Sequence, residues 1–149
     1  MRQEFSRTLE VAAPRQKAWE TVVDVGRVAG WISIVGGVQE LSPLDRYGAV
    51  LEDWLGPFKL RADLEIRVVE LDEGRRLRAT ASGEDRQVGS RIAVDATLAL
   101  EERERGTAIG VSGAYEVTGR VAALGAGSIR KKAESVLEDF FSHAEAALG

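Results

Sequence analysis

The chain has 149 residues and a formal net charge of −4, which predicts one domain and argues against a general nucleic-acid binder, because such binding depends on clustered Lys and Arg. It has no cysteine and one histidine, His143, which excludes disulfides and thiolate sites and argues against imidazole metal sites and serine triads. The N-terminus lacks a signal peptide's apolar core, and no stretch approaches the roughly 20 apolar residues of a membrane span, so we expect a soluble cytoplasmic protein without a metal site.

The first part of the chain predicts a strand followed by two short helices. Residues 4–11 largely alternate apolar and polar side chains, as a half-buried strand does. Residues 13–25 place Pro14 in a first turn and carry an apolar stripe, which is typical of a helix. Residues 26–33 predict a second short helix with Trp31 on its inner side.

Six more strands are expected next. The alternation is clearest in residues 60–70, where apolar side chains including Leu64 alternate with charged ones, so one face of the sheet meets water. The connections between these segments are short, which favours antiparallel neighbours. The predicted strands comprise residues 38–41, 47–55, 60–70, 75–82, 90–100 and 107–118.

The C-terminal segment, from about residue 120 to 148, predicts the longest helix. Its apolar residues recur at three- and four-residue spacing, and that apolar face must be covered by the sheet. The order of elements therefore predicts an α+β fold within a single domain over residues 1–149. We expect a curved seven-stranded antiparallel sheet wrapped around a long C-terminal helix, with two short helices after the first strand.

The start of this last helix is rich in glycine and alanine. The stretch 119–132, GRVAALGAGSIRKK, has the order strand, glycines, helix that many phosphate-binding loops share. A phosphate loop, however, belongs to a parallel βαβ unit, and here no strand follows and no Gly-Lys-Ser/Thr closes the run. The basic run 130–132 is expected on a solvated helix face, with contact to anionic lipid headgroups as the alternative.

Size offers another reason for these glycines. Glycine in a helix costs about 1 kcal/mol relative to alanine, so something should offset it. Either the helix lies very close to the sheet, or its small residues leave an empty volume. We expect a cavity that is open near the helix start and plugged toward its end by larger side chains, with close packing and no cavity as the alternative.

Apolar and small side chains around this space are the candidate ligand-binding residues, although each tryptophan could equally be a core residue. Trp31, Trp54 and Phe58 are expected at the rim, because pockets are mostly apolar with a few polar groups. The full set of candidates is Trp31, Ile34, Val35, Trp54, Phe58, Leu64, Ala96, Tyr115, Leu124, Ala126, Ile129 and Ala133.

An enzyme would need an acid or base in that space. Glu52 and Asp53 are neighbours on one predicted strand, so one of them must point inward, and the sequence does not decide which. Together with Tyr115 they are weak catalytic candidates. Asp95 and His143 are expected at the surface.

Several stretches resemble one protein family. They are VAAPRQKAWETVVDVGRVAGWI, GVQEL, YGAVLEDWLGPFKLRADLEI, GTAIGVSGAYEVTGRVAALGAGSI and the terminal FF. The chain is similar to the CoxG family of carbon monoxide dehydrogenase, within the START-like, helix-grip superfamily (SRPBCC) that includes the polyketide cyclases. One departure is Gly36-Gly37, where the family usually has a Pro-Gly pair in a loop expected at the pocket rim.

The resemblance implies an internal apolar cavity and an accessory role beside the catalytic subunits of carbon monoxide dehydrogenase at the inner face of the membrane. It implies a non-catalytic carrier of an isoprenoid quinone such as menaquinone, or of a lipid, with no covalent cofactor. Some members carry a C-terminal tail that reaches the membrane, which these 149 residues do not include. The alternatives are a polyketide-cyclase or dehydratase-like enzyme using a pocket carboxylate, and a ligand-free assembly or membrane-recruitment factor.

Overall fold

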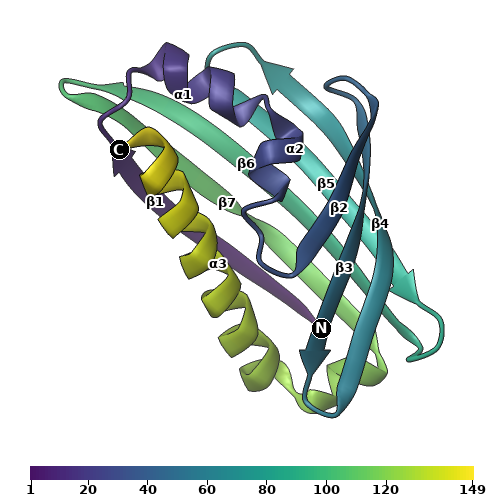
Figure 1. The fold of residues 1–149 in the computed structure, drawn as a ribbon. Helices are drawn as coiled ribbons and strands as arrows, with labels where there is room; N and C mark the ends of the chain where they lie inside the picture. Colours follow the sequence, from purple (N-terminus) through teal and green to yellow (C-terminus); the bar gives the residue numbers. More distant parts are fainter.

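The computed structural model describes residues 1–149, in which one large sheet curves around a long helix (Figure 1). The sheet's concave side holds α3, and the two short helices α1 and α2 close one end of it. The elements are β1 (Arg2–Val11), α1 (Arg15–Val22), α2 (Val25–Ala29), β2 (Val35–Ser42), β3 (Arg46–Leu55), β4 (Phe58–Asp72), β5 (Arg76–Asp85), β6 (Ser90–Arg103), β7 (Gly106–Gly119), the 3-10 helix η1 (Arg120–Leu124) and α3 (Ala126–Leu148).

The sheet has seven strands in the order β1-β7-β6-β5-β4-β3-β2, and every neighbouring pair is antiparallel. Short turns join β2 through β7 in a meander. The last strand, β7, also pairs with the first strand, β1. This confirms the predicted α+β helix-grip fold, including the two short helices after the first strand.

Alternation within the strands decides which face is the core. In β4 the buried residues Leu60, Leu64 and Ile66 alternate with exposed charged residues, and β3 pairs with this strand in a register that places Leu51 and Ala49 on the same inner face. A one-residue slip would expose the whole set, so burial fixes the register.

The long helix begins later than the sequence predicts. Residues 120–124 form η1, and α3 starts at Ala126 after Gly125, whose φ of +91° favours glycine. A Cβ atom at Gly125 or Gly127 would meet nothing within 4 Å, so close packing against the sheet does not explain these glycines. Both glycines are exposed, so the space beside them is open to solvent and is not an enclosed volume between helix and sheet.

Two other predicted boundaries differ. The second short helix ends at Ala29 rather than near residue 33, so Trp31 lies just beyond it. Gly36-Gly37, expected in a loop, lies inside β2, where the register with β3 shifts between Gly36 and Gln39 and Gly37 has a φ of +59°.

The C-terminal half of α3 is attached by aromatic contacts and a backbone hydrogen bond. The Phe140 ring makes edge-on contacts with Trp31 and with Phe141, each with ring centroids 5.7 Å apart. The backbone N–H of Ala13 donates to the Leu148 carbonyl at 3.0 Å. These contacts join the end of the helix to the α1–α2 end of the molecule.

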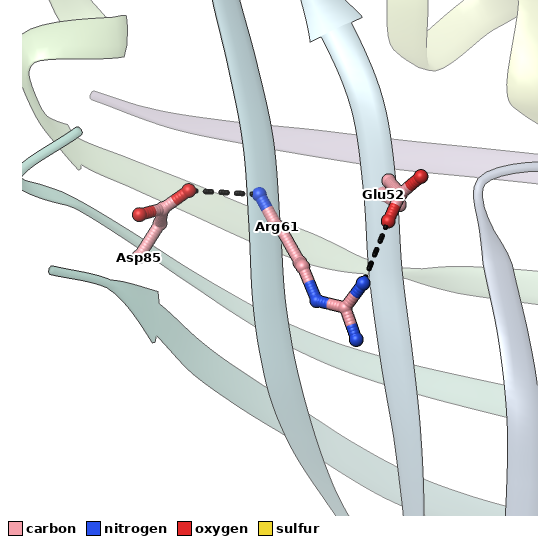
Figure 2. A network of polar contacts seen from close by, with 3 residues as sticks. All are labelled: Glu52, Arg61 and Asp85. Atoms are coloured by element: carbon pink, nitrogen blue, oxygen red, sulfur yellow. Dashed lines mark hydrogen bonds and ion pairs between the residues drawn. The ribbon is translucent and has the colours of Figure 1, made fainter. Parts of the chain in front are cut away.

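A polar cluster closes the opposite end of the sheet (Figure 2). The buried Asp85 carboxylate accepts hydrogen bonds from the backbone N–H groups of Arg61 at 2.8 Å, Gln87 at 2.9 Å and Val88 at 3.1 Å. The Arg61 guanidinium, on the outer face, donates to Glu52 at 3.1 Å. The donated hydrogen bonds, above all that of the Arg61 N–H, hold the pKa of Asp85 below its usual range.

Asp85→Ala is expected to lower the free energy of unfolding by about 1–3 kcal/mol near neutral pH, because three backbone donors lose their acceptor. A folded-state pKa below the unfolded value of about 3.9 means that this stabilisation is present above that pH and disappears as the pH falls through the folded pKa. Urea denaturation of both proteins at neutral and acid pH measures the difference. A gap that stays constant down to acid pH would contradict this role.

Candidate functional site: a cleft and cavity at the start of the long helix

An open cleft lies where the β3–β4 turn meets the start of α3. The turn approaches η1 so closely that a Cβ atom at Gly56 would lie 2.9 Å from Leu124 Cδ2. The cleft has a volume of about 300 Å³, at the lower end of the range for ligand pockets. It is lined by Trp54, Leu55, Gly56, Leu124, Ser128, Lys131, Lys132 and Ser135.

A small cavity adjoins this cleft on the inner side, and Leu55 and Lys132 line both spaces. Its volume is about 30 Å³, close to that of one water molecule. The boundary between cleft and interior therefore consists of one apolar and one charged side chain. The cavity is lined by Ile34, Leu51, Asp53, Leu55, Leu60, Ser90, Arg91, Ile92, Val117, Val121 and Lys132.

Further along the inner face, the middle strands remain partly uncovered. Ala79 of β5 pairs with Ala96 of β6, and Ala81 pairs with Val94, on the same face as the buried Leu77. All four side chains are only half-buried. Ala79 and Ala81 pack against the core, and none of the four lines the cleft or the inner cavity, so this part of the inner face is covered only in part.

The structure decides between the two neighbouring carboxylates of β3. Asp53 faces inward, opposite the buried Leu60 in the β3–β4 ladder, and it lines the inner cavity. Glu52 faces outward and pairs with Arg61, with 47% of its side chain exposed (Figure 2). The candidate pocket carboxylate is therefore Asp53.

Asp53 has a charged partner from α3. The Lys132 ammonium lies 2.5 Å from Asp53 Oδ2, with 37% of the Lys132 side chain and 21% of the Asp53 side chain exposed. The contact is an ion pair. Asp53 Oδ2 is buried, and the ammonium is not aligned with it as a hydrogen-bond donor.

Tyr115 lies elsewhere on the inner face. Its hydroxyl is buried without a hydrogen-bond partner, and burial raises the pKa of this phenol while nearby Arg130 acts in the opposite direction. Tyr115 lines neither the cleft nor the inner cavity. Arg130 and Lys132 are two residues apart on α3 and point to different sides of the helix, so the structure does not bring Tyr115 and Asp53 into one site.

The other predicted ligand-binding residues are distributed along the interior. Trp54, 61% exposed, and Leu124 line the cleft, whereas Ile34 lines the inner cavity. The remaining ones line neither space: Trp31, Val35, Phe58, Ala96 and Ala133 are half-buried, Leu64 and Ile129 are buried in the core, and Ala126 is exposed in the first turn of α3.

Sequence reasoning missed Lys132, because it assigned the whole basic run to a solvated face. A signal was present in the spacing. Ile129, Val136 and Phe140 mark the inner stripe of α3, and residue 132 falls on that stripe three positions after Ile129. A charged residue that interrupts an apolar helix stripe needs a partner, and here the partner is Asp53.

The other ionisable candidates are at the surface. Asp95 pairs with Arg78 on the outer face through two hydrogen bonds, of 2.9 Å and 2.7 Å, and His143 is exposed on α3. No group of three or more His, Asp or Glu side chains is placed to hold a metal ion. No helix combines the length and apolar character needed to cross a membrane.

Solved structures share this architecture. A conserved protein from Geobacillus kaustophilus superimposes with a TM-score of 0.82 at 19% identity, covering 99% of this chain and 95% of that one. A START superfamily protein from Mycobacterium smegmatis gives 0.74 at 16% identity, covering 97% of this chain and 96% of that one. The di-domain ARO/CYC StfQ from the steffimycin biosynthetic pathway gives 0.66 at 11% identity, covering 99% of this chain and 51% of that one.

The fold is thus that of the START-like, helix-grip proteins. The sequence matches the family model for the CoxG subunit of carbon monoxide dehydrogenase over residues 8–149, and the chain belongs to that family. No curated protein matches the sequence.

Proposed function

We propose that this protein is a non-catalytic carrier of an apolar small molecule, an isoprenoid quinone such as menaquinone or a lipid. The observation that supports the proposal is the partly exposed apolar inner face of β5 and β6, represented by Ala79, Ala81, Val94 and Ala96. The cleft at the start of α3 opens toward the inner cavity through Leu55 and Lys132, which line both spaces.

Family membership supports the setting in which the carrier works. The family is named after carbon monoxide dehydrogenase, so the proposed partner is the catalytic part of that enzyme. A quinone is a fitting cargo, because electrons that leave such an enzyme must reach the membrane pool. The inner cavity of about 30 Å³ is too small for a ring, so loading requires the boundary at Leu55 and Lys132 to open.

Native mass spectrometry tests the proposal directly. The protein is purified from a quinone-containing host, and bound molecules are extracted with solvent and identified. Delipidated protein is then incubated with menaquinone, and in parallel with a phospholipid. We expect a one-to-one complex with one of them. A protein that is empty as purified and takes up neither compound contradicts the carrier proposal.

A polyketide-cyclase-like activity is the second candidate, and the inward position of Asp53 favours it. Two features weigh against it: the Lys132 ammonium already compensates the carboxylate, and Tyr115 lies outside the Asp53 cavity. Turnover of a poly-β-ketone substrate that is lost in Asp53→Asn would support the enzyme.

A further inference from the structure

The ion pair of Asp53 and Lys132 lies where the outer cleft adjoins the inner cavity. Asp53 and Lys132 both line the inner cavity, and Lys132 also lines the outer cleft. Their surroundings are mainly apolar, with Leu55, Leu60 and Ile92 among the lining residues. The two charged groups therefore lie where the cleft and the inner cavity adjoin.

The pair is incompletely satisfied. Asp53 Oδ2 is buried, and the nearby ammonium does not donate to it along a hydrogen-bond direction. Asp53 Oδ2 has a charged neighbour in Lys132 but no aligned donor, whereas most buried acceptors in proteins accept an aligned hydrogen bond. The adjacent Glu52 differs, since it accepts a hydrogen bond from Arg61 in a solvated position. Of the two neighbouring carboxylates, only the inward one, Asp53, therefore has a buried oxygen that lacks an aligned hydrogen-bond donor.

A hydroxyl group meets both needs at once. Its hydrogen can be donated to Asp53 Oδ2, while its oxygen can accept a hydrogen bond from the Lys132 ammonium. A carbonyl or an ether oxygen can accept from Lys132 but has nothing to donate to Asp53. An aromatic ring that bears the hydroxyl would lie in the outer cleft, which has the volume for it, with its apolar surface against Leu55 and Leu124.

We infer that Asp53 and Lys132 form a head-group site that selects cargo ending in a phenol- or hydroquinone-type hydroxyl over the matching carbonyl or ether. The inference rests on the proposed carrier function and adds the chemistry of the cargo's polar end. For a quinone cargo, the reduced form is the one held more tightly.

Two small probes that differ in a single donor test this selection. 1-Naphthol has the hydroxyl, and 1-methoxynaphthalene replaces its hydrogen by a methyl group. Isothermal titration calorimetry on the full chain is expected to give about tenfold or more tighter binding of naphthol, because a hydrogen bond to a charged group is among the stronger ones.

Variants of Asp53, Lys132 and Glu52 test whether the ion pair is the cause of the preference for naphthol. The paired change Asp53→Leu with Lys132→Met replaces both charged groups by apolar ones of comparable length, which avoids leaving one charge unpaired. We expect the two probes to bind this double variant with similar affinity, because it offers neither an acceptor nor a donor to the probe oxygen. Asp53→Asn is expected to lower the naphthol preference, whereas Glu52→Gln, which changes the neighbouring outward carboxylate, is expected to preserve it.

The outcomes separate this inference from the carrier proposal. Equal affinities of the unaltered protein for both probes, or a naphthol preference that survives the paired change, would overturn the head-group site while leaving an apolar carrier intact. Absence of binding by either probe, together with failure to take up menaquinone or phospholipid, would overturn both.

Discussion

Ala96→Phe is expected to reduce menaquinone uptake by about tenfold or more while leaving the protein folded. Ala96 lies on the inner face of β6 opposite Ala79, in the half-covered region of the sheet. A phenyl ring there fills the volume that the cargo would occupy. Overpacking costs about 1–3 kcal/mol, and each 1.4 kcal/mol is a factor of ten in affinity. Uptake is measured by native mass spectrometry of protein incubated with menaquinone.

Ala99→Phe is the matched control on the same strand. Ala99 is exposed, and its position three residues after Ala96 places it on the outer face of the sheet. We expect unchanged uptake, and for both variants a free energy of unfolding within about 1 kcal/mol of the parent. Normal uptake by Ala96→Phe would show that the cargo does not occupy the inner face of the middle strands.

Phe140→Ala is expected to lower the free energy of unfolding by about 3–5 kcal/mol, the usual cost of removing a buried aromatic ring. The Phe140 ring is buried and contacts Trp31 and Phe141, so its loss leaves a cavity between α3 and the segment after α2. Urea denaturation followed by tryptophan fluorescence measures the change in midpoint.

Two further variants calibrate that result. Phe140→Leu retains part of the packing and is expected to cost less than the alanine change. Glu138→Ala alters an exposed position on the same helix and should change stability by no more than about 0.5 kcal/mol. A loss for Phe140→Ala as small as that for Glu138→Ala would contradict the role of the aromatic contact, because alanine is the better helix former at both positions and propensity cannot explain a loss.

The fold was largely predictable because its elements carry strong and different periodicities. The alternation in β4 and β6 and the three- and four-residue spacing in α3 each correspond to one face packed on a core. The boundaries at η1 were not predictable in the same way. Ala122 and Leu124 continue the helical spacing, yet the positive φ of Gly125 interrupts the helix between them and Ala126.

The site was less predictable, because it depends on which way single side chains point. Whether Glu52 or Asp53 faced inward required the exact register of β3 near the Gly56 turn, which the pattern of polar residues alone leaves open. The Asp53–Lys132 pair joins residues that are far apart in sequence. Such a contact follows from the curvature of the sheet around α3, which no local pattern encodes.

The two halves of α3 are attached to the rest of the chain by different kinds of contact, so a tilt of the helix would affect them differently. Its backbone hydrogen bond to the rest of the chain is at Leu148, and its aromatic contacts are at Phe140 and Phe141, all in its second half. An α-helix rises about 1.5 Å per residue, so the first turn lies about 21 Å from Phe140. A tilt of about 10° around that contact would move the first turn by about 4 Å. Such a tilt would separate Lys132 from Asp53 and widen the cleft, and it would also have to break the Arg130–Gln3 hydrogen bonds and uncover Ile129.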